Sequence, residues 1–228
     1  MNSKIAASLL KILSPSMGFE SGYLRKLPLI ESDSLDSIVE RVKHCIDGSN
    51  AEWDSFEISW DFKKHPLLRN VSTISEAFTQ WQSECDDRFN QLKANEEELN
   101  RIFIDIYGLQ DELTQEVEDK DVTVRKADLQ RDIKSLLSYA VGCMFGRYSL
   151  DVEGLAYAGG EWDSSKYQSY IPDADNVIPI TDEEYLDDDI VSRLCAWLKA
   201  VYGADTLEAN LDYIAKALGN KGSTSREI

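Results

Sequence analysis

The side chains that could bind a metal or carry out catalysis are few in this sequence and lie far apart. The only two histidines, His44 and His65, have no second ligand-type residue at the spacing of a zinc site. We therefore predict no zinc site. Asp173, Asp175 and Asn176 resemble the start of a calcium-binding loop, but the glycine and the closing glutamate that such a loop requires are missing. We interpret this stretch as an ordinary loop.

Signatures of nucleotide-binding loops are also missing from the sequence. There is no G-x-x-x-x-G-K-[ST] stretch, and no two glycines form a G-x-G pattern. The acidic run Asp187, Asp188 and Asp189 is interpreted as a solvated helix face, because carboxylates abound in this chain. No nucleophile, base and orienting residue form a recognisable catalytic set. We therefore predict no catalytic, cofactor-binding or metal-binding residues in this chain.

The cysteines and the hydropathy indicate a cytoplasmic protein. Three of the four cysteines, Cys85, Cys143 and Cys195, lie in helical patterns, and no two cysteines form a CxxC pair. This placement predicts reduced, buried thiols. No apolar run reaches the roughly 18–20 residues that span a bilayer, and the opening residues do not read as a signal peptide. We expect no membrane partner.

The net charge of −18 is unevenly distributed. Residues 1–70 are close to neutral, whereas residues 71–228 contain 15 Lys and Arg against 32 Asp and Glu. Such an excess argues against broad DNA binding through phosphate neutralisation and favours a solvated surface. Any DNA contacts are expected at the few basic spots, which are Lys63, Lys64, Arg125, Lys126 and Arg147.

Periodicity predicts two helices at the start of the chain. The first begins at the capping residue Ser3, ends before Pro15 and Gly18, and places three apolar residues on one face. The second starts at Asp33 or Ser34 and closes at Gly48. The first apolar face is Ile5, Leu9 and Ile12, and the second is Leu35, Ile38, Val39, Val42 and Ile46. In the linker 49–72 we expect four aromatic residues to pack on a neighbouring element: Trp53, Phe56, Trp60 and Phe62.

The strongest pattern predicts one long helix that ends at Gly108. Apolar residues recur every three or four positions over some 33 residues, a length of about 50 Å. Their narrow seam requires a partner helix, and the opposite face is charged. The seam consists of Ile74, Phe78, Trp81, Cys85, Phe89, Leu92, Leu99, Phe103 and Ile106.

Further helices are predicted after this one. An acidic connector leads to a brief strand at Asp121–Val124. Asp128 then caps a helix that runs to Gly146, and the last third of this helix is apolar nearly all round, which predicts a central position. The segment 151–180 reads as a long loop, either functional or wrapped over the surface. Two final helices follow the capping boxes Thr181-x-x-Glu184 and Asp205-x-x-Glu208, end at Gly203 and Gly219, and leave a flexible tail. The predicted fold class is mainly α, with one long helix packed on further helices and few short strands.

Several blocks of the sequence resemble a known enzyme family. They are Asn2–Leu29, SWDFKKHPLL (59–68), FNQLKANEEELNRIFIDIYGLQDEL (89–113) and DVTVRKADLQRDIKSLLSYAVGCMFGRYSLD (121–151), continued by residues 153–163 and 178–191. In this order they closely resemble the adenine-specific DNA methyltransferases of BREX phage-defence systems, the PglX type. The first block reads like the middle of a larger enzyme, and Ser223–Ile228 reads like the start of a new segment. We therefore expect an internal piece.

The resemblance implies a region that follows a Rossmann-like catalytic domain and precedes a target-recognition part. Enzymes of this family use S-adenosylmethionine and an Asn-Pro-Pro-Tyr-type motif to methylate the N6 of a flipped adenine. No two of the five prolines are adjacent here, so this motif is missing, as is the glycine-rich cofactor loop. We therefore expect a chain that is inactive alone and binds no cofactor.

On this basis we expect a non-catalytic helical connector. Its partners would be the catalytic and target-recognition parts of the methyltransferase, with DNA bound through the assembly. The expected division is an end of the catalytic lobe (1–30), a helix with an aromatic linker (31–72), a helical spacer (73–219) and a flexible tail (220–228). Two alternatives stay open: a subunit of a split, active adenine methyltransferase, and an acidic interaction protein or DNA mimic.

Overall fold

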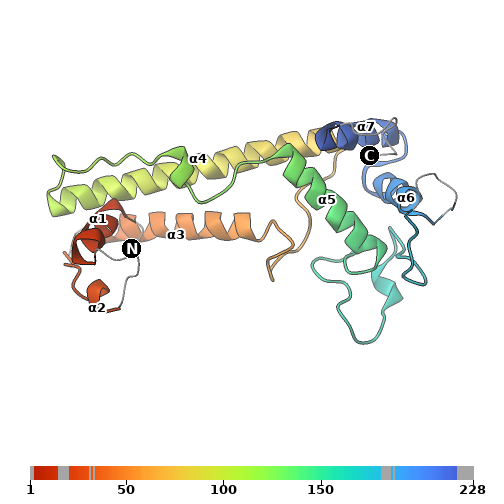
Figure 1. The fold of residues 1–228 in the computed structure, drawn as a ribbon, viewed down its shortest axis with the longest axis horizontal. Helices are drawn as coiled ribbons and strands as arrows, with labels where there is room; N and C mark the ends of the chain where they lie inside the picture. Colours follow the sequence, from red (N-terminus) through yellow and green to blue (C-terminus); the bar gives the residue numbers. More distant parts are fainter. Residues whose placement is uncertain are drawn as a thin grey trace. The chain divides into compact units, whose positions relative to one another are not determined.

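The computed structural model of the chain describes residues 3–14, 21–30, 32, 34–180, 186 and 188–219. These residues form seven α-helices and two 3-10 helices, and they contain no β-strand (Figure 1). The mainly α-helical class and the single long helix are therefore confirmed. The α-helices are α1 (Lys4–Leu13), α2 (Ser21–Leu24), α3 (Leu35–Trp53), α4 (Ile74–Tyr107), α5 (Leu129–Met144), α6 (Ile190–Tyr202) and α7 (Leu207–Leu218); the 3-10 helices are η1 (Asp119–Asp121) and η2 (Ser164–Lys166).

The chain divides into two compact units. Unit 1 comprises Met1–Ala51 and Asp86–Arg125, and unit 2 comprises Glu52–Cys85 and Lys126–Ile228. Helix α4 contributes to both, because its residues up to Cys85 belong to unit 2 and the rest belong to unit 1. The functional division of the chain into four parts stays a prediction.

Unit 2 is built around α5. Asp128 caps this helix as predicted, since its side chain accepts a hydrogen bond from the backbone N–H of Arg131 at 2.7 Å. Helices α6 and α7 and the first part of α4 pack around it, so its predicted central position is confirmed for this unit. The first turn of α4 is tied to α7, because the buried Asn210 Oδ1 accepts a hydrogen bond from Ile74 N at 2.8 Å. This contact satisfies one of the backbone donors that a helix N-terminus leaves unpaired.

Unit 1 is built on the second part of α4. Phe89 and Leu92 pack with Val122 and Val124 of the returning connector. The predicted brief strand at Asp121–Val124 is wrong, since η1 occupies its start and the described residues include no strand with which the extended backbone at Val122 could pair. Because alternate side chains of an extended segment point the same way, both valines still reach the helix.

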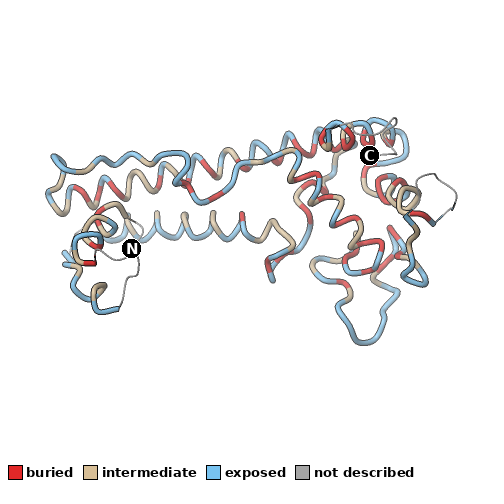
Figure 2. The backbone as a smooth tube through the Cα atoms, in the orientation of Figure 1, coloured by how far each residue is buried: buried red, intermediate tan, exposed pale blue. Residues whose placement is uncertain are grey.

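Helix α3 differs from its prediction in length and in orientation. It continues through Gly48 to Trp53. The buried side faces α4 through Arg41, whose Nη1 donates to Asn95 Oδ1 at 3.4 Å, and through Cys45, which packs on the Phe89 and Leu92 cluster. Figure 2 shows most of α3 as exposed or intermediate. The predicted apolar face is therefore not the face that packs within the described residues.

Smaller corrections concern the helix starts and ends. In α1, Ile5 and Leu10 are buried, but Ile12 is 78% exposed and lies off the packed face. The residues Pro15 and Gly18, Asp33, the first predicted capping box and the tail lie outside the described residues. Helix α6 is capped instead by Asp189, whose side chain accepts from Ser192 N at 2.7 Å. The second capping box is wrong, because Thr206 occupies the cap of α7 and makes no side-chain capping bond.

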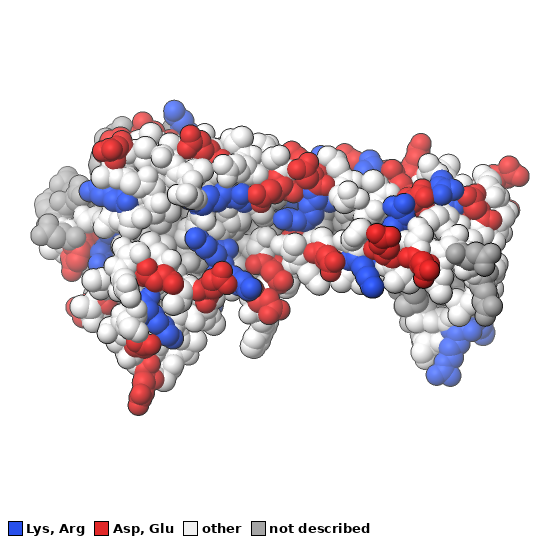
Figure 3. Space-filling model, turned by 180° about the vertical axis from the view of Figure 1, so that it is seen from behind, with Lys and Arg blue, Asp and Glu red and all other residues white. Residues whose placement is uncertain are grey.

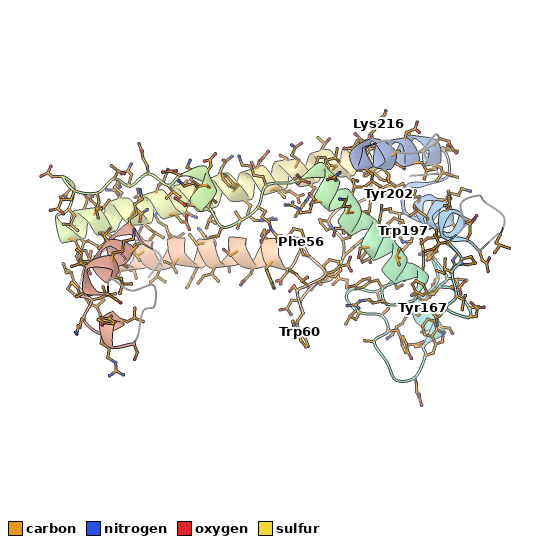
Figure 4. All side chains as sticks on the ribbon, viewed as in Figure 1. Phe56, Trp60, Tyr167, Trp197, Tyr202 and Lys216 are labelled. Atoms are coloured by element: carbon orange, nitrogen blue, oxygen red, sulfur yellow. The ribbon has the colours of Figure 1, made fainter. Side chains whose placement is uncertain are left out.

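The aromatic residues of the linker have different environments. Phe62 is buried in the core of unit 2, and Phe56 is half-buried with the guanidinium of Arg131 5.6 Å from its ring centroid. Trp53 is 50% exposed, and Trp60 is fully exposed and projects away from the ribbon (Figure 4). The expectation that all four aromatics fix the linker therefore holds for Phe56 and Phe62 and is wrong for Trp60.

Candidate interaction site

The best-defined polar site in unit 2 lies where α5 ends. Gly146 adopts a φ of +74°, a left-handed conformation that glycine tolerates best, and turns the chain into the long loop 151–180. The Tyr167 hydroxyl closes this turn by donating to Gly146 O at 2.6 Å. Trp162 stacks on Tyr167 with ring centroids 4.7 Å apart and 5° between the planes. The loop is therefore fixed over the end of α5, in agreement with the predicted wrapping.

Backbone hydrogen bonds of this loop hold two of the predicted basic residues. Gly154 N donates to Lys63 O at 2.7 Å, and Ala156 N donates to Arg147 O at 2.9 Å. The Lys166 ammonium also donates to Ala156 O at 2.9 Å. One short stretch of loop thus anchors Lys63, Arg147 and Lys166 from three separate segments.

The charges at this site are mixed. Lys63 Nζ lies 3.9 Å from Glu153 Oε2, with both side chains 73% exposed, so this pair adds little stability. Arg147 Nε donates to the Tyr148 hydroxyl at 3.2 Å, and its guanidinium lies 5.5 Å from the Tyr148 ring centroid. Burial raises the pKa of Glu57, against hydrogen bonds from Ser138 and Tyr148 and the charge of Arg147. A phosphate would meet carboxylates here as well as cations.

The other predicted basic residues do not join this site. Lys64 and Lys126 are exposed, and Arg125 belongs to unit 1. On the face shown in Figure 3, Lys and Arg side chains are interspersed with Asp and Glu rather than gathered in one basic patch. Contact of any of the five with DNA stays a prediction.

Asp132 links α4 and α5 inside unit 2, a role that the sequence did not reveal. The residue is 2% exposed, and its carboxylate accepts from the Trp81 indole Nε1 at 3.0 Å, from Asp128 N at 3.1 Å and from Arg131 Nε at 2.7 Å. The one sequence signal was an acidic residue within the predicted apolar side of α5. A buried carboxylate with three donors is a structural anchor rather than a reactive group.

The predicted thiols and histidines have structural environments. Cys85, Cys143 and Cys195 are buried and form no disulfide bond, as predicted. Burial raises the pKa of Cys143 to about 12, so it stays a protonated thiol and not a nucleophile. His65 is buried and accepts from Leu67 N through Nδ1 at 3.2 Å, whereas His44 is exposed. Within the described ranges, no three His, Cys, Asp or Glu residues form a group that could hold a metal ion.

The described helices do not have the character of membrane-spanning segments. In the part of the chain that the structure describes, none of them combines the length and the apolar character needed to cross a bilayer.

Comparison with known proteins identifies relatives along the whole chain, although no protein-family model matches it. The chain is 52% identical over 235 aligned residues to the adenine-specific methyltransferase PglX of Lacticaseibacillus casei (strain Zhang), covering 100% of this chain and 20% of that protein. It is 30% identical over 240 aligned residues to the adenine-specific methyltransferase BrxX of Escherichia coli O9:H4 (strain HS), covering 96% of this chain and 20% of that protein. The chain thus spans about one fifth of the length of these relatives. Along its whole length the chain therefore corresponds to one segment of the PglX-type adenine-specific methyltransferases.

Proposed function

We propose that this segment is a non-catalytic helical connector between the catalytic and target-recognition parts of a cytoplasmic adenine-specific DNA methyltransferase. The observation that carries the proposal is that one helix, α4, supplies core residues to two units. Ile74, Trp81 and Cys85 are buried in unit 2, and Phe89 and Leu92 are buried in unit 1. A segment with this construction is suited to joining larger parts of an enzyme.

S-adenosylmethionine, the cofactor of the parent family, does not fit the residues present. The described residues form no strand, so they offer no edge of a Rossmann-like sheet. The full sequence has neither adjacent prolines nor a G-x-G loop. We place cofactor binding and methyl transfer in other parts of the enzyme, and we derive no catalytic step for this segment.

A proline within α4 tests the connector role. Asp87 is exposed on α4, next to the boundary between the two units. Proline there removes a helical hydrogen bond and kinks the helix, at a cost of about 3 kcal/mol or more. The change is made in the full-length 52%-identical relative, with this segment grafted in place of its own. We expect Asp87→Pro to lower adenine methylation at least tenfold and to leave S-adenosylmethionine affinity unchanged in calorimetry.

The matched control is Asp87→Ala, which keeps the helix and should retain activity. Normal methylation by a folded Asp87→Pro enzyme would contradict the connector role. Micromolar binding of S-adenosylmethionine to the isolated chain would contradict the non-catalytic assignment. Restored methylation on mixing the chain with a separately expressed catalytic part would instead identify a split enzyme. A salt-sensitive complex with a basic protein that competes with DNA would identify a DNA mimic.

A further inference from the structure

Helix α3 carries an exposed apolar stripe on unit 1. Its members are spaced by four, three and four residues and are Leu35, Val39, Val42 and Ile46, with exposed fractions of 62%, 43%, 39% and 53%. At 3.6 residues per turn this spacing puts all four on one side of the helix, over about 16 Å. Apolar side chains at this spacing normally pack against another helix.

The stripe is distinct from the face through which α3 packs on α4. That face consists of Arg41, Cys45 and Gly48, where Arg41 Nη2 lies 3.9 Å from Glu98 Oε1 and Gly48 approaches Arg88. Of these two faces of α3, the described residues cover the one with Arg41, Cys45 and Gly48 and leave the stripe exposed. A contiguous apolar patch with a polar rim is typical of an interaction site.

An acidic edge borders the stripe on the side away from α4. Asp36, Glu40 and Asp47 are exposed there, with Lys43 as the one cation among them. In paired helices the residues beside an apolar seam select the partner by charge. A second copy of α3 would bring the same acidic edge and like-charge repulsion. A helix whose apolar seam is flanked by Lys and Arg is complementary to both the apolar stripe and the acidic edge.

We propose that the α3 stripe docks an amphipathic helix with basic flanks, from the part of the methyltransferase that this chain does not span. The inference rests on the proposed function, since that function places the segment inside a larger enzyme. It assigns to unit 1 a specific attachment surface. In the bound state the stripe becomes a buried seam, and the acidic edge pairs with the cations of the incoming helix.

Amide hydrogen exchange in two contexts tests this proposal. The isolated chain is compared with the full-length 52%-identical relative carrying the segment. We expect the amides of residues 35–46 to exchange at least tenfold more slowly in the full-length enzyme. The double variant Val39→Gln/Val42→Gln should abolish this difference and leave the isolated chain folded, because glutamine favours helix and both positions are exposed. The matched control is Ile12→Gln, which replaces an exposed β-branched residue of unit 1 outside the stripe.

Two substitutions at Glu40 test whether the partner helix is basic. Glu40→Lys should reduce the protection of residues 35–46 from amide exchange more than Glu40→Gln does. High salt should make the protection of the two variants more similar, because it screens the charge interaction. Equal exchange in the two contexts overturns the proposal. A dimer of the isolated chain that the double variant abolishes in sedimentation assigns the stripe to a second copy and also overturns it. Failure of the connector role would appear as normal methylation by Asp87→Pro, with the exchange difference intact.

Discussion

Asp132 and His65 are both buried polar residues of unit 2, yet different interactions hold them in place. The Asp132 carboxylate is compensated by three donors, one of them a guanidinium. His65 has one backbone donor, Leu67 N, and burial lowers its pKa to about 3, so the imidazole is neutral in the folded chain. Protonation would place a charge in the core without a partner.

This difference predicts that the folded chain loses stability at acidic pH and that part of the loss depends on His65. The unfolded imidazole has a pKa near 6.5, so below that pH the unfolded chain binds a proton that the folded chain excludes. Stability is therefore retained above about pH 6.5 and lost as the pH falls toward the folded pKa, by up to about 1.4 kcal/mol per pH unit. His65→Asn, whose Oδ1 can accept from Leu67 N without titrating, should flatten this part of the profile in urea unfolding between pH 4.5 and 7.

The exposed His44→Asn is the matched control and should keep the parent profile. An unchanged slope in His65→Asn would show that the acid sensitivity comes from carboxylates instead. The measurement thus distinguishes the contribution of one buried imidazole to the pH dependence of stability from that of the 42 acidic residues of the chain.

Which residues carry polar contacts was only partly predictable. Buried thiols followed from apolar periodicity and were found. Asp189 was assigned to a solvated face, but it is 2% exposed and caps α6. An acidic run does not reveal which carboxylate meets a helix N-terminus, because that depends on the backbone path before the helix.

At the scale of elements, α3 shows why a correct helix can have the wrong inward face in a prediction. Hydropathy ranks Val39, Val42 and Ile46 above Arg41 and Gly48 as core residues. The packed face nevertheless includes Gly48, which lies beside the Arg88 side chain, and Arg41, which pairs with Glu98. A pattern of hydropathy cannot separate an internal contact from an interface.

The turn that ends α5 gives a prediction for one glycine. A Cβ on Gly146 would lie 2.8 Å from the Trp162 ring and 3.4 Å from Pro172, at a φ of +74°. Gly146→Ala therefore combines backbone strain with overpacking, and we expect it to lower the free energy of unfolding by about 2–4 kcal/mol. Urea unfolding followed by tryptophan fluorescence measures this loss.

Gly154→Ala isolates the backbone part of that effect. Gly154 has nearly the same φ, +73°, but its Cβ would meet only Phe62 O at an ordinary 3.6 Å. We expect this variant to lose about 1 kcal/mol, in the range of a left-handed alanine. An equal loss of unfolding free energy in the two variants would show that the Trp162 ring moves aside at no cost and does not fix the loop.

At the scale of the whole molecule, the residues of one periodic pattern, that of α4, are divided between two hydrophobic cores. The length of α4 was predictable because its seam repeats locally over 34 residues. Its division between units was not, because the partners of the seam come from distant positions, such as Asn210 on Ile74, 136 residues away. Local periodicity predicted the buried residues of α4 up to Leu92. Further along, Leu99, Phe103 and Ile106 are only half-buried while Ile102 and Ile104 are buried, so the tertiary fold decides which face of the helix packs.

If each unit has its own core, a cavity in one should leave the other protected from exchange. Leu136 is fully buried in unit 2, so Leu136→Ala should cost about 2–5 kcal/mol through lost burial and a cavity. Native-state hydrogen exchange should then accelerate in α5, α6 and α7 and stay unchanged at residues 89–104, since local stability follows the core that protects each amide. Leu155→Ala, at a leucine that is 55% exposed, provides the matched control. Equal acceleration at residues 89–104 would mean that α4 couples both units into one cooperative structure, because fraying would then spread along the helix they share.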